Sequence, residues 1–137
     1  QAADLHRRVL ADRERVLGTD HPHTLNSRNN LAAALNDLGE HQQAADLHRR
    51  VLADRERVLG TDHAHTLSSR NNLAAALDNL GEHQQAADLH RRVLADRERV
   101  LGTDHPHTLN SRNNLAIARA RLAEVGRRRW WQLPRRR

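Results

Sequence analysis

The chain has 137 residues, of which 23 are Arg, 17 are acidic and 11 are His, so its formal net charge is +6. Cys is absent, which excludes disulfides, thiolate metal sites and a cysteine nucleophile. The longest apolar run, Leu31 to Leu35, is too short to span a bilayer. Met is also absent, and we expect the chain to be a segment of a longer protein.

A repeat of 42 residues organises the sequence. Residues 43–84 copy residues 1–42 with four differences, and residues 85–126 copy them with seven, all from Ile117 onward. The four differences lie at positions 22/64, 26/68, 36/78 and 37/79. Copies this close indicate one helical unit that stacks on itself to cover its apolar face. We therefore divide the chain into a repeat array, 1–126, and a basic, Trp-containing tail, 127–137.

In chain order, apolar residues at helical spacing predict a helix over 2–17, helices over about 24–38 and 41–59, the same pair again one period later, and a last helix of the 24–38 type in the third copy. We call the 24–38 type the A helix and the 41–59 type the B helix. The array then holds six helices, beginning on a B helix and ending on an A helix. Asp46, Arg50 and Asp54 are expected to form a ladder of opposite charges on the solvent face of the B helix. No segment alternates with a period of two, so the expected fold class is an all-α, right-handed α-solenoid of antiparallel helix pairs.

Single glycines mark the expected helix ends. Gly39 suits a left-handed stop after the A helix, and Gly60 ends the B helix. Pro22 and Pro106, in the connectors, are tolerated in the first turn of a helix.

The last A helix departs from its copies. Ala123 stands where the other copies have the turn glycine, so this helix is expected to continue to Val125 and to stop at Gly126. Arg119 and Arg121 replace a leucine and an aspartate of the first copy. Because a solenoid needs a polar outer face on its terminal unit, we interpret these two arginines as a C-terminal cap.

The unit resembles a tetratricopeptide repeat, through Asn30-Leu31-Ala32 in the first helix, Gly39 at the turn and Ala44 early in the second. The 42-residue period and the connector Arg55-Glu56-Arg57-Val58-Leu59-Gly60-Thr61-Asp62-His63 are similar to the kinesin-light-chain type. The resemblance covers residues 1–126 and implies a cytoplasmic, non-enzymatic scaffold for protein–protein interaction. It also implies a superhelix that binds a peptide or protein segment in the concave groove lined by the A helices. The chain departs from the family at His41 and His48, where aromatics are common, and at Arg28, where a bulky apolar residue is usual, which suggests a more polar and pH-sensitive interior.

Paired asparagines recur on each A helix, and a row of carboxamides can hold an extended peptide backbone because each both donates and accepts. Three of the four differences between the first two copies fall on the groove positions that the resemblance implies. We interpret this as variation where a ligand would touch; neutral drift on an exposed face is the alternative. The predicted groove residues are Asn26, Asn29, Asn30, Asn36, Asp37, Ser68, Asn71, Asn72, Asp78, Asn79, Asn110, Asn113, Asn114 and Arg121.

The histidines are the only candidate metal ligands with a pattern. His21 and His23 stand beside Asp20 in a connector, but the set lacks further ligands, so we expect no metal and no cofactor. His6, His48 and His90 lie on the inward stripe of the B helices, where we expect packing with one ring nitrogen hydrogen-bonded. Their enforced protonation near pH 5–6 is expected to lower stability.

Catalysis is not expected, because every candidate acid, base or serine is copied into each unit rather than forming one asymmetric site. Two alternatives to a peptide groove stay open. The Arg/Trp tail could bind nucleic acid or an anionic surface, fold back over the last helix, or be disordered. The charge of residues 1–126 sums to zero, so the tail carries the whole net charge and nucleic acid is an improbable partner of the array.

The other alternative is a purely structural or engineered repeat segment. Its last helix would pack on the first helix of another copy, a head-to-tail self-association that propagates rather than closes. The polar cap argues against such stacking.

Overall fold

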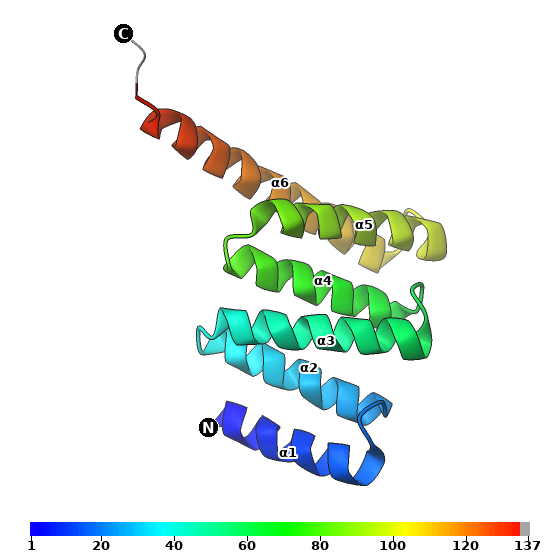
Figure 1. Ribbon diagram of the computed structural model, residues 1–137. Helices are drawn as coiled ribbons and strands as arrows, with labels where there is room; N and C mark the ends of the chain where they lie inside the picture. Colours follow the sequence, from blue (N-terminus) through cyan, green and yellow to red (C-terminus); the bar gives the residue numbers. More distant parts are fainter. Residues whose placement is uncertain (135–137) are drawn as a thin grey trace.

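The computed structural model describes residues 1–134, and six α-helices stack in it in chain order (Figure 1). The helices are α1 (Ala2–Leu17), α2 (Pro22–Asp37), α3 (His41–Leu59), α4 (Ala64–Asn79), α5 (His83–Leu101) and α6 (Pro106–Gln132). The predicted B helices are α1, α3 and α5, and the A helices are α2, α4 and α6. The described residues hold no strand, which confirms the all-α repeat fold.

Each helix packs against its neighbours in chain order, so α1 and α6 lie at opposite ends of the stack (Figure 1). This arrangement is that of a solenoid, in which a unit contacts the next unit and little else. Among the described helices, none combines the length and the hydropathy that crossing a bilayer requires.

A histidine caps each A helix, which therefore begins two residues earlier than the sequence predicts. His21 Nδ1 accepts a hydrogen bond from the backbone N–H of His23 at 3.1 Å, and Pro22 occupies the first turn, as expected. Thr24, fully buried, donates its hydroxyl to the carbonyl of Gly18 at 2.7 Å and so ties the connector to the helix. The same capping contact recurs at His63 and His105.

The turn from A helix to B helix depends on Gly39. Its φ is +82°, and the following N–H of Glu40 donates to the carbonyl of Leu35 at 2.9 Å. A residue with a Cβ is strained in this left-handed conformation, and the hydrogen bond satisfies one of the free carbonyls at the helix end. The predicted left-handed stop is confirmed.

The core between the helices consists of small and aliphatic side chains. Ala32, Ala44 and Ala45 have no exposed surface, so neighbouring helices approach closely at these positions. Leucines fill the remaining space in two clusters, one between α1, α2 and α3 and one between α3, α4 and α5.

A buried arginine joins each internal A helix to the two B helices beside it. Arg28 is only 1% exposed at its side chain; its Nη2 donates to Glu14 of α1 at 3.0 Å and its Nη1 to Asp54 of α3 at 2.9 Å. Arg70 makes the same two contacts one period later, to Glu56 at 3.1 Å and Asp96 at 2.9 Å. We call each arginine with its two carboxylates an arginine clamp.

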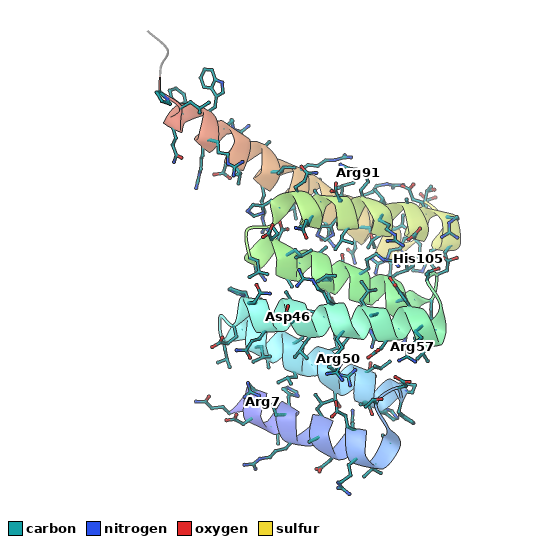
Figure 2. The ribbon with its side chains drawn as sticks, in the orientation of Figure 1. Arg7, Asp46, Arg50, Arg57, Arg91 and His105 are labelled. Carbon is teal, nitrogen blue, oxygen red and sulfur yellow. The ribbon has the colours of Figure 1, made fainter. Side chains whose placement is uncertain are left out.

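The expected ladder of charges on the B helix is wrong, because Asp54 serves the clamp. Asp46, which Figure 2 labels on α3 together with Arg57, pairs instead with Arg49, three residues away, at 3.1 Å. Asp54 also contacts Arg57 at 3.2 Å. The carboxylate that looks solvent-facing in the helical pattern is thus recruited by the neighbouring helix.

The last helix is longer than predicted. It runs through Gly126, which takes helical backbone angles, and continues to Gln132, so the expected stop at Gly126 is wrong. In Figure 1 this extension projects beyond the stack. The last three residues of the predicted tail, 135–137, lie outside the described residues.

Candidate functional site

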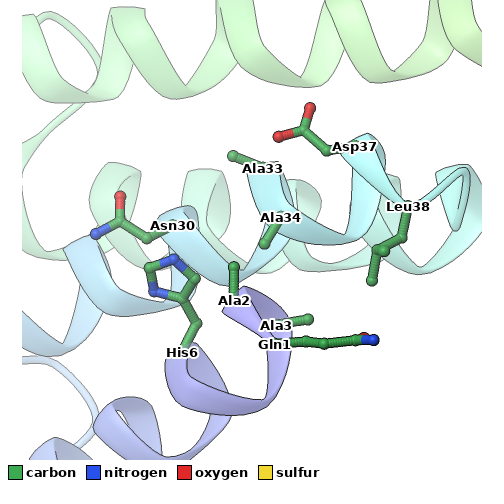
Figure 3. Close-up of a pocket in the computed structure, with 9 residues that line it drawn as sticks. All are labelled: Gln1, Ala2, Ala3, His6, Asn30, Ala33, Ala34, Asp37 and Leu38. Carbon is green, nitrogen blue, oxygen red and sulfur yellow. The ribbon is translucent and has the colours of Figure 1, made fainter.

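Three hollows recur along one face of the stack, one for each repeat. The first, about 330 Å³, lies between α1 and α2 and is lined by His6, Asn30, Ala33 and Asp37, among others (Figure 3). The second, about 230 Å³, lies where α2 and α4 meet α3 and includes His48. The third, about 330 Å³, lies where α4 and α6 meet α5 and includes His90.

Neighbouring hollows share lining residues, which makes the face continuous. Ala33 and Asp37 line both the first and the second hollow, and Ala75 and Asn79 line both the second and the third. We call this surface the A-helix groove: the three hollows together, bordered by α2, α4 and α6 with one B-helix histidine in each.

Ten of the fourteen predicted groove residues line these hollows. They are Asn29, Asn30, Asn36, Asp37, Asn71, Asn72, Asp78, Asn79, Asn114 and Arg121. Asn26 is used elsewhere, because its Oδ1 accepts a hydrogen bond from Arg55 at 2.8 Å. Ser68 is half-buried, and Asn110 and Asn113 are exposed on the A helices. That these residues bind a peptide stays a prediction.

The asparagines of the groove are hydrogen-bonded to one another from one A helix to the next. Asn72 Nδ2 donates to Asn29 Oδ1 at 3.1 Å, and Asn114 Nδ2 donates to Asn71 Oδ1 at 3.1 Å. Each pair uses Nδ2 of one asparagine and Oδ1 of the other. The second Nδ2 and the second Oδ1 remain for other partners. The amides therefore hold the A helices in register as well as lining the groove.

Of the three B-helix histidines predicted to pack inward with one ring nitrogen hydrogen-bonded, His48 and His90 are buried, whereas His6 is half-buried. Nδ1 of each of the two buried imidazoles has no hydrogen-bond partner. Burial lowers the pKa of both side chains; at His90 the charge of Asp78 opposes this shift and that of Arg121 adds to it. Both hollows therefore contain a neutral imidazole with one unused polar atom.

One groove position, Asn36 in the first repeat and Asp78 in the second, changes from neutral to charged along the chain. In the first repeat, Asn36 Oδ1 accepts a hydrogen bond from Asn79 Nδ2 at 2.9 Å and contacts His41 Nδ1 at 2.7 Å. One period later the residue is Asp78, whose buried carboxylate contacts His83 Nδ1 at 2.8 Å and Arg121 at 3.2 Å.

Arg121 thus lies on the groove, where the prediction also placed it, and it does not serve as an end cap. Arg119 remains exposed on α6. Of the two arginines interpreted as a cap, only Arg119 can make the outer face polar.

Sequence reasoning missed two sets of residues. His48 and His90 line hollows, and their recurrence at one position of the repeat, on the inward stripe, was the available signal. The clamp partners Glu14 and Asp54 carried no local signal, because they lie 14 and 26 residues from Arg28 in the chain. No cluster of three or more possible metal ligands occurs among residues 1–134.

The aromatic part of the tail does not fold back over the last helix. Trp130 and Trp131 are 72% and 75% exposed on the extension of α6, with their rings perpendicular and 6.2 Å apart. The interpretation in which these indoles cover the end of the array is therefore wrong.

Comparisons with known proteins agree on the kind of repeat. The sequence profile of the tetratricopeptide repeat matches residues 1–23, 24–65 and 66–107. A crystal structure of nearly identical TPR-like repeats, from a kinesin-light-chain protein of Podosopora anserina, is 31% identical, with a TM-score of 0.82 over 91% of this chain and 59% of that one. A single-substitution variant of that protein gives a TM-score of 0.81 at the same identity and coverage.

A more distant structure supports the fold alone. BtubC (BKLC) from P. vanneervenii is 20% identical, with a TM-score of 0.68 over 98% of this chain and 60% of that one. The chain thus spans about three fifths of the length of the solved structures it matches. No curated protein matches.

Proposed function

The chain belongs to the tetratricopeptide repeat family, whose members serve as scaffolds for protein–protein interaction, and on that premise we propose that its A-helix groove binds an extended segment of a protein partner without catalysis. The observation that carries the proposal is the continuity of the three hollows, each of which shares two residues with the next.

The chemistry of the groove suits a peptide backbone. The amide groups that the asparagine pairs leave unused can donate to peptide carbonyls and accept from peptide N–H groups. The hollows between them, of about 230 to 330 Å³, have room for side chains. The asparagine amides repeat along the groove, while the charges beside them change. We therefore propose that contacts between these amides and the peptide backbone supply affinity, and that the charged groups of Asp78 and Arg121 supply selectivity.

The experiment is peptide selection from a displayed random library on the full chain, followed by titration of the selected peptides. Ala75 is exposed, lines two hollows and is not part of any hydrogen-bonded side-chain pair. Ala75→Arg should therefore fill the groove without unfolding it, and it should weaken binding at least about tenfold.

The matched control is Ala95→Arg, the same change at an exposed alanine on α5 that lines none of the three hollows. Equal loss in both variants, or no loss in Ala75→Arg, would contradict the proposal. An Asn71→Ala/Asn72→Ala double variant then tests the amides themselves, with folding checked by circular dichroism because both residues also bridge A helices.

A second candidate function is supported by the exposure of both indoles beside Arg127, Arg128 and Arg129 on α6. Aromatic rings flanked by guanidinium groups can stack on bases or lie at an anionic lipid surface. Binding of single-stranded oligonucleotide or of anionic vesicles should fall steeply between about 50 mM and about 200 mM salt and should disappear when residues 127–137 are deleted. Binding in the groove should survive that deletion.

A further inference from the structure

A further hollow lies away from the A-helix groove, beside the connectors that lead from each B helix to the next A helix. These connectors run along one side of the stack, on the right in Figure 1. The hollow has a volume of about 240 Å³ and lies between the end of α3 and the starts of α2 and α4. We call it the connector hollow, and the residues that line it are Asp20, Pro22, Leu25, Arg55, Val58, Leu59, His63 and His65.

We propose that the connector hollow binds a small organic anion, namely a carboxylate attached to an apolar body of about one ring. The site lies on inner helices of the stack, and a different set of residues lines it from the set that lines the A-helix groove. The proposal therefore goes beyond the binding of a peptide and concerns a second class of ligand.

Aliphatic side chains form most of the surface that such a ligand would meet. Leu25 is 2% exposed and Leu59 is half-buried, whereas Pro22 and Val58 are exposed at the rim. Covering these groups with an apolar ring removes apolar surface from water, which is favourable. Because pockets for drug-sized molecules usually measure about 300–1,000 Å³, a hollow of about 240 Å³ suits a smaller molecule.

The positive charge in the hollow comes from a buried arginine that is held by neutral groups. Arg55 is 5% exposed, and its Nη1 donates to Ser69 Oγ at 2.8 Å and to the carbonyl oxygen of His65 at 3.3 Å. Its Nη2 donates to Asn26 Oδ1 at 2.8 Å. Each arginine clamp, by contrast, holds two carboxylates, whereas no carboxylate of residues 1–134 pairs with Arg55.

A buried charge without an opposite charge is unfavourable, because burial removes the water that would stabilise it. Burial accordingly lowers the pKa of the Arg55 side chain. A guanidinium has five N–H donors, and the three hydrogen bonds leave one on Nη2 and one on Nε among the described contacts. A carboxylate can accept from two such donors at once and would supply the missing charge.

Two imidazoles at the rim make the surroundings more favourable for an anion. His63 Nδ1 accepts a hydrogen bond from the backbone N–H of His65 at 3.0 Å, so the neutral ring of His63 carries its proton on Nε2 and can donate there. Burial lowers the pKa of His65, and the positive charges of Arg55 and His63 lower it further. Cations are therefore disfavoured beside His65, and an anion would be favoured in the same place.

One carboxylate also lines the hollow, and its charge is already offset. Asp20 accepts two hydrogen bonds from Arg57, at 2.6 and 3.0 Å. These bonds lower the pKa of Asp20, so it stays ionised and paired. The charge that still lacks a partner in the connector hollow is that of Arg55.

The differences between the first two repeats also point to this hollow. Pro22 lines it and Asn26 binds its arginine, whereas Ala64 and Ser68 stand at these positions one period later. Position 22/64 is the one difference that the A-helix groove does not include. Variation where a ligand would touch thus accounts for it here.

Benzoate is the probe for this site, with two controls of related chemistry. Benzamide keeps the ring without the charge, and acetate keeps the charge without the ring. In NMR titrations of the isotope-labelled full chain, benzoate should bind with a Kd of about 1 mM or tighter and should shift the signals of Arg55, His63 and His65 most. Benzamide and acetate should each bind at least about tenfold more weakly.

A carboxylate built into the hollow should compete with the probe. Val58→Glu places an acidic group at the rim, where it can pair with Arg55, and it should weaken benzoate binding at least about tenfold. Ala53→Glu is the matched control, because it makes the same change of charge at an exposed position of α3 outside the hollow. This variant should bind benzoate like the parent chain.

Removing the charge itself is the second test. Arg55→Met should abolish the shifts of His63 and His65 on addition of benzoate. Arg97→Met is its matched control, since Arg97 is 6% exposed and donates to Ser111 Oγ at 2.8 Å in the same manner one repeat later. It should leave those shifts unchanged. Circular dichroism checks the folding of both variants, and if Arg55→Met does not fold, the two glutamate variants decide.

Equal affinities for benzoate and benzamide would overturn the proposal, because the charge would then play no part. Equal weakening of benzoate binding in Val58→Glu and Ala53→Glu would also overturn it. So would benzoate shifts that centre on the arginines of residues 127–129, because the anion would then bind elsewhere.

Discussion

At the scale of single residues, the arginine clamps decide what the interior can tolerate. A buried guanidinium is costly to desolvate, and the cost is offset only when carboxylates are placed close to it. Each clamp takes its two carboxylates from two different helices, Glu56 from α3 and Asp96 from α5 in the case of Arg70. The contact therefore selects the register of three helices at once.

Removing a clamp arginine should destabilise the fold strongly. In Arg70→Ala, the partly buried carboxylates of Glu56 and Asp96 lose their contact with the buried guanidinium, Asp96 keeps only Arg99, and a cavity remains. We therefore expect a loss of about 3–5 kcal/mol in the free energy of unfolding. Arg112→Ala is the matched control, because Arg112 is 43% exposed and holds one carboxylate, and it should cost about 0–1 kcal/mol. Urea denaturation followed by circular dichroism measures both; similar losses would contradict the burial argument.

The buried histidines should make stability depend on pH. Because burial lowers the pKa of His48 and His90 below the ordinary 6.5, the unfolded chain binds protons that the folded chain resists. Their contribution is complete above pH 6.5 and is lost as the pH falls toward the folded-state pKa. The aspartates held by Arg57 and Arg99 have pKa values below 3.8, so they remain charged at pH 5.

The melting temperature should therefore be lower at pH 5 than at pH 7.5. A His48→Leu/His90→Leu double variant should show a smaller difference between the two pH values. An unchanged melting temperature in the parent chain would show that these imidazoles take up protons without cost.

The sequence predicted the polar, histidine-bearing interior but not the atoms that meet in it. The inward position of His48 follows from helical spacing alone, which is why it could be predicted. The partners of Arg28 depend on how α1 and α3 cross α2, and helical spacing within one element carries no information about that crossing. The asparagine pairs were missed as contacts for the same reason, since Asn72 and Asn29 are 43 residues apart.

At the scale of helices, two glycines with different backbone angles have opposite roles. Gly60 has a φ of +91° at the end of α3, whereas Gly126 lies within α6, where a Cβ would have no neighbouring atom within 4 Å. A Cβ is strained at the first position and favourable for the helix at the second.

Substituting alanine at these positions should change stability in opposite directions. Gly60→Ala should lower the free energy of unfolding by about 1–2 kcal/mol, because it forces a side chain into a left-handed conformation. Gly126→Ala should stabilise the end of α6 by about 0.5–1 kcal/mol. Thermal denaturation reads out the first change, and amide hydrogen exchange of residues 127–132 reads out the second; faster exchange there would contradict a helical Gly126.

The bounds of the B helices were predictable to the residue, whereas those of the A helices were not. The start of α2 was missed because His21, a residue type rarely expected as a cap, accepts the hydrogen bond that a serine or aspartate usually accepts. The end of α6 was missed because an exposed glycine does not by itself stop a helix. Once the turn sequence is lost, nothing after Ala123 reverses the chain, and the helix continues to Gln132.

At the scale of the whole molecule, stability should vary along the stack. Inner helices are covered on both sides and α1 and α6 on one, since helices contact mainly their neighbours in chain order. We expect the slowest amide exchange in α3 and α4, faster exchange in α1, and the fastest in the extension of α6. Native-state hydrogen exchange by mass spectrometry measures this order, and uniform protection would indicate a single cooperative unit instead.

The repeat pattern predicted the solenoid because each 42-residue unit carries both of the surfaces through which it packs against the units beside it. The groove was predicted in outline for the same reason, since residues at one position of the repeat must lie in a row on one face. What the row binds depends on the few positions where copies differ, such as Asn36 and Asp78, and a single chain offers too few of these to define a ligand.

The same ion pairs join α2 to α3 and α4 to α5: an arginine clamp to an aspartate, and a second arginine to an aspartate of the connector. This repetition bears on how such a protein changes length over evolutionary time. If residues 43–84 were deleted by recombination between copies, Arg28 would meet the carboxylate of Asp96, and Asp20 would meet Arg99. The residues that took the places of Asp54 and Arg57 at the new junction would be identical to them, whereas Arg121 would take the place of Asn79 beside Asn36. Gain or loss of a whole unit would then lengthen or shorten the groove in steps of one hollow without requiring a compensating substitution.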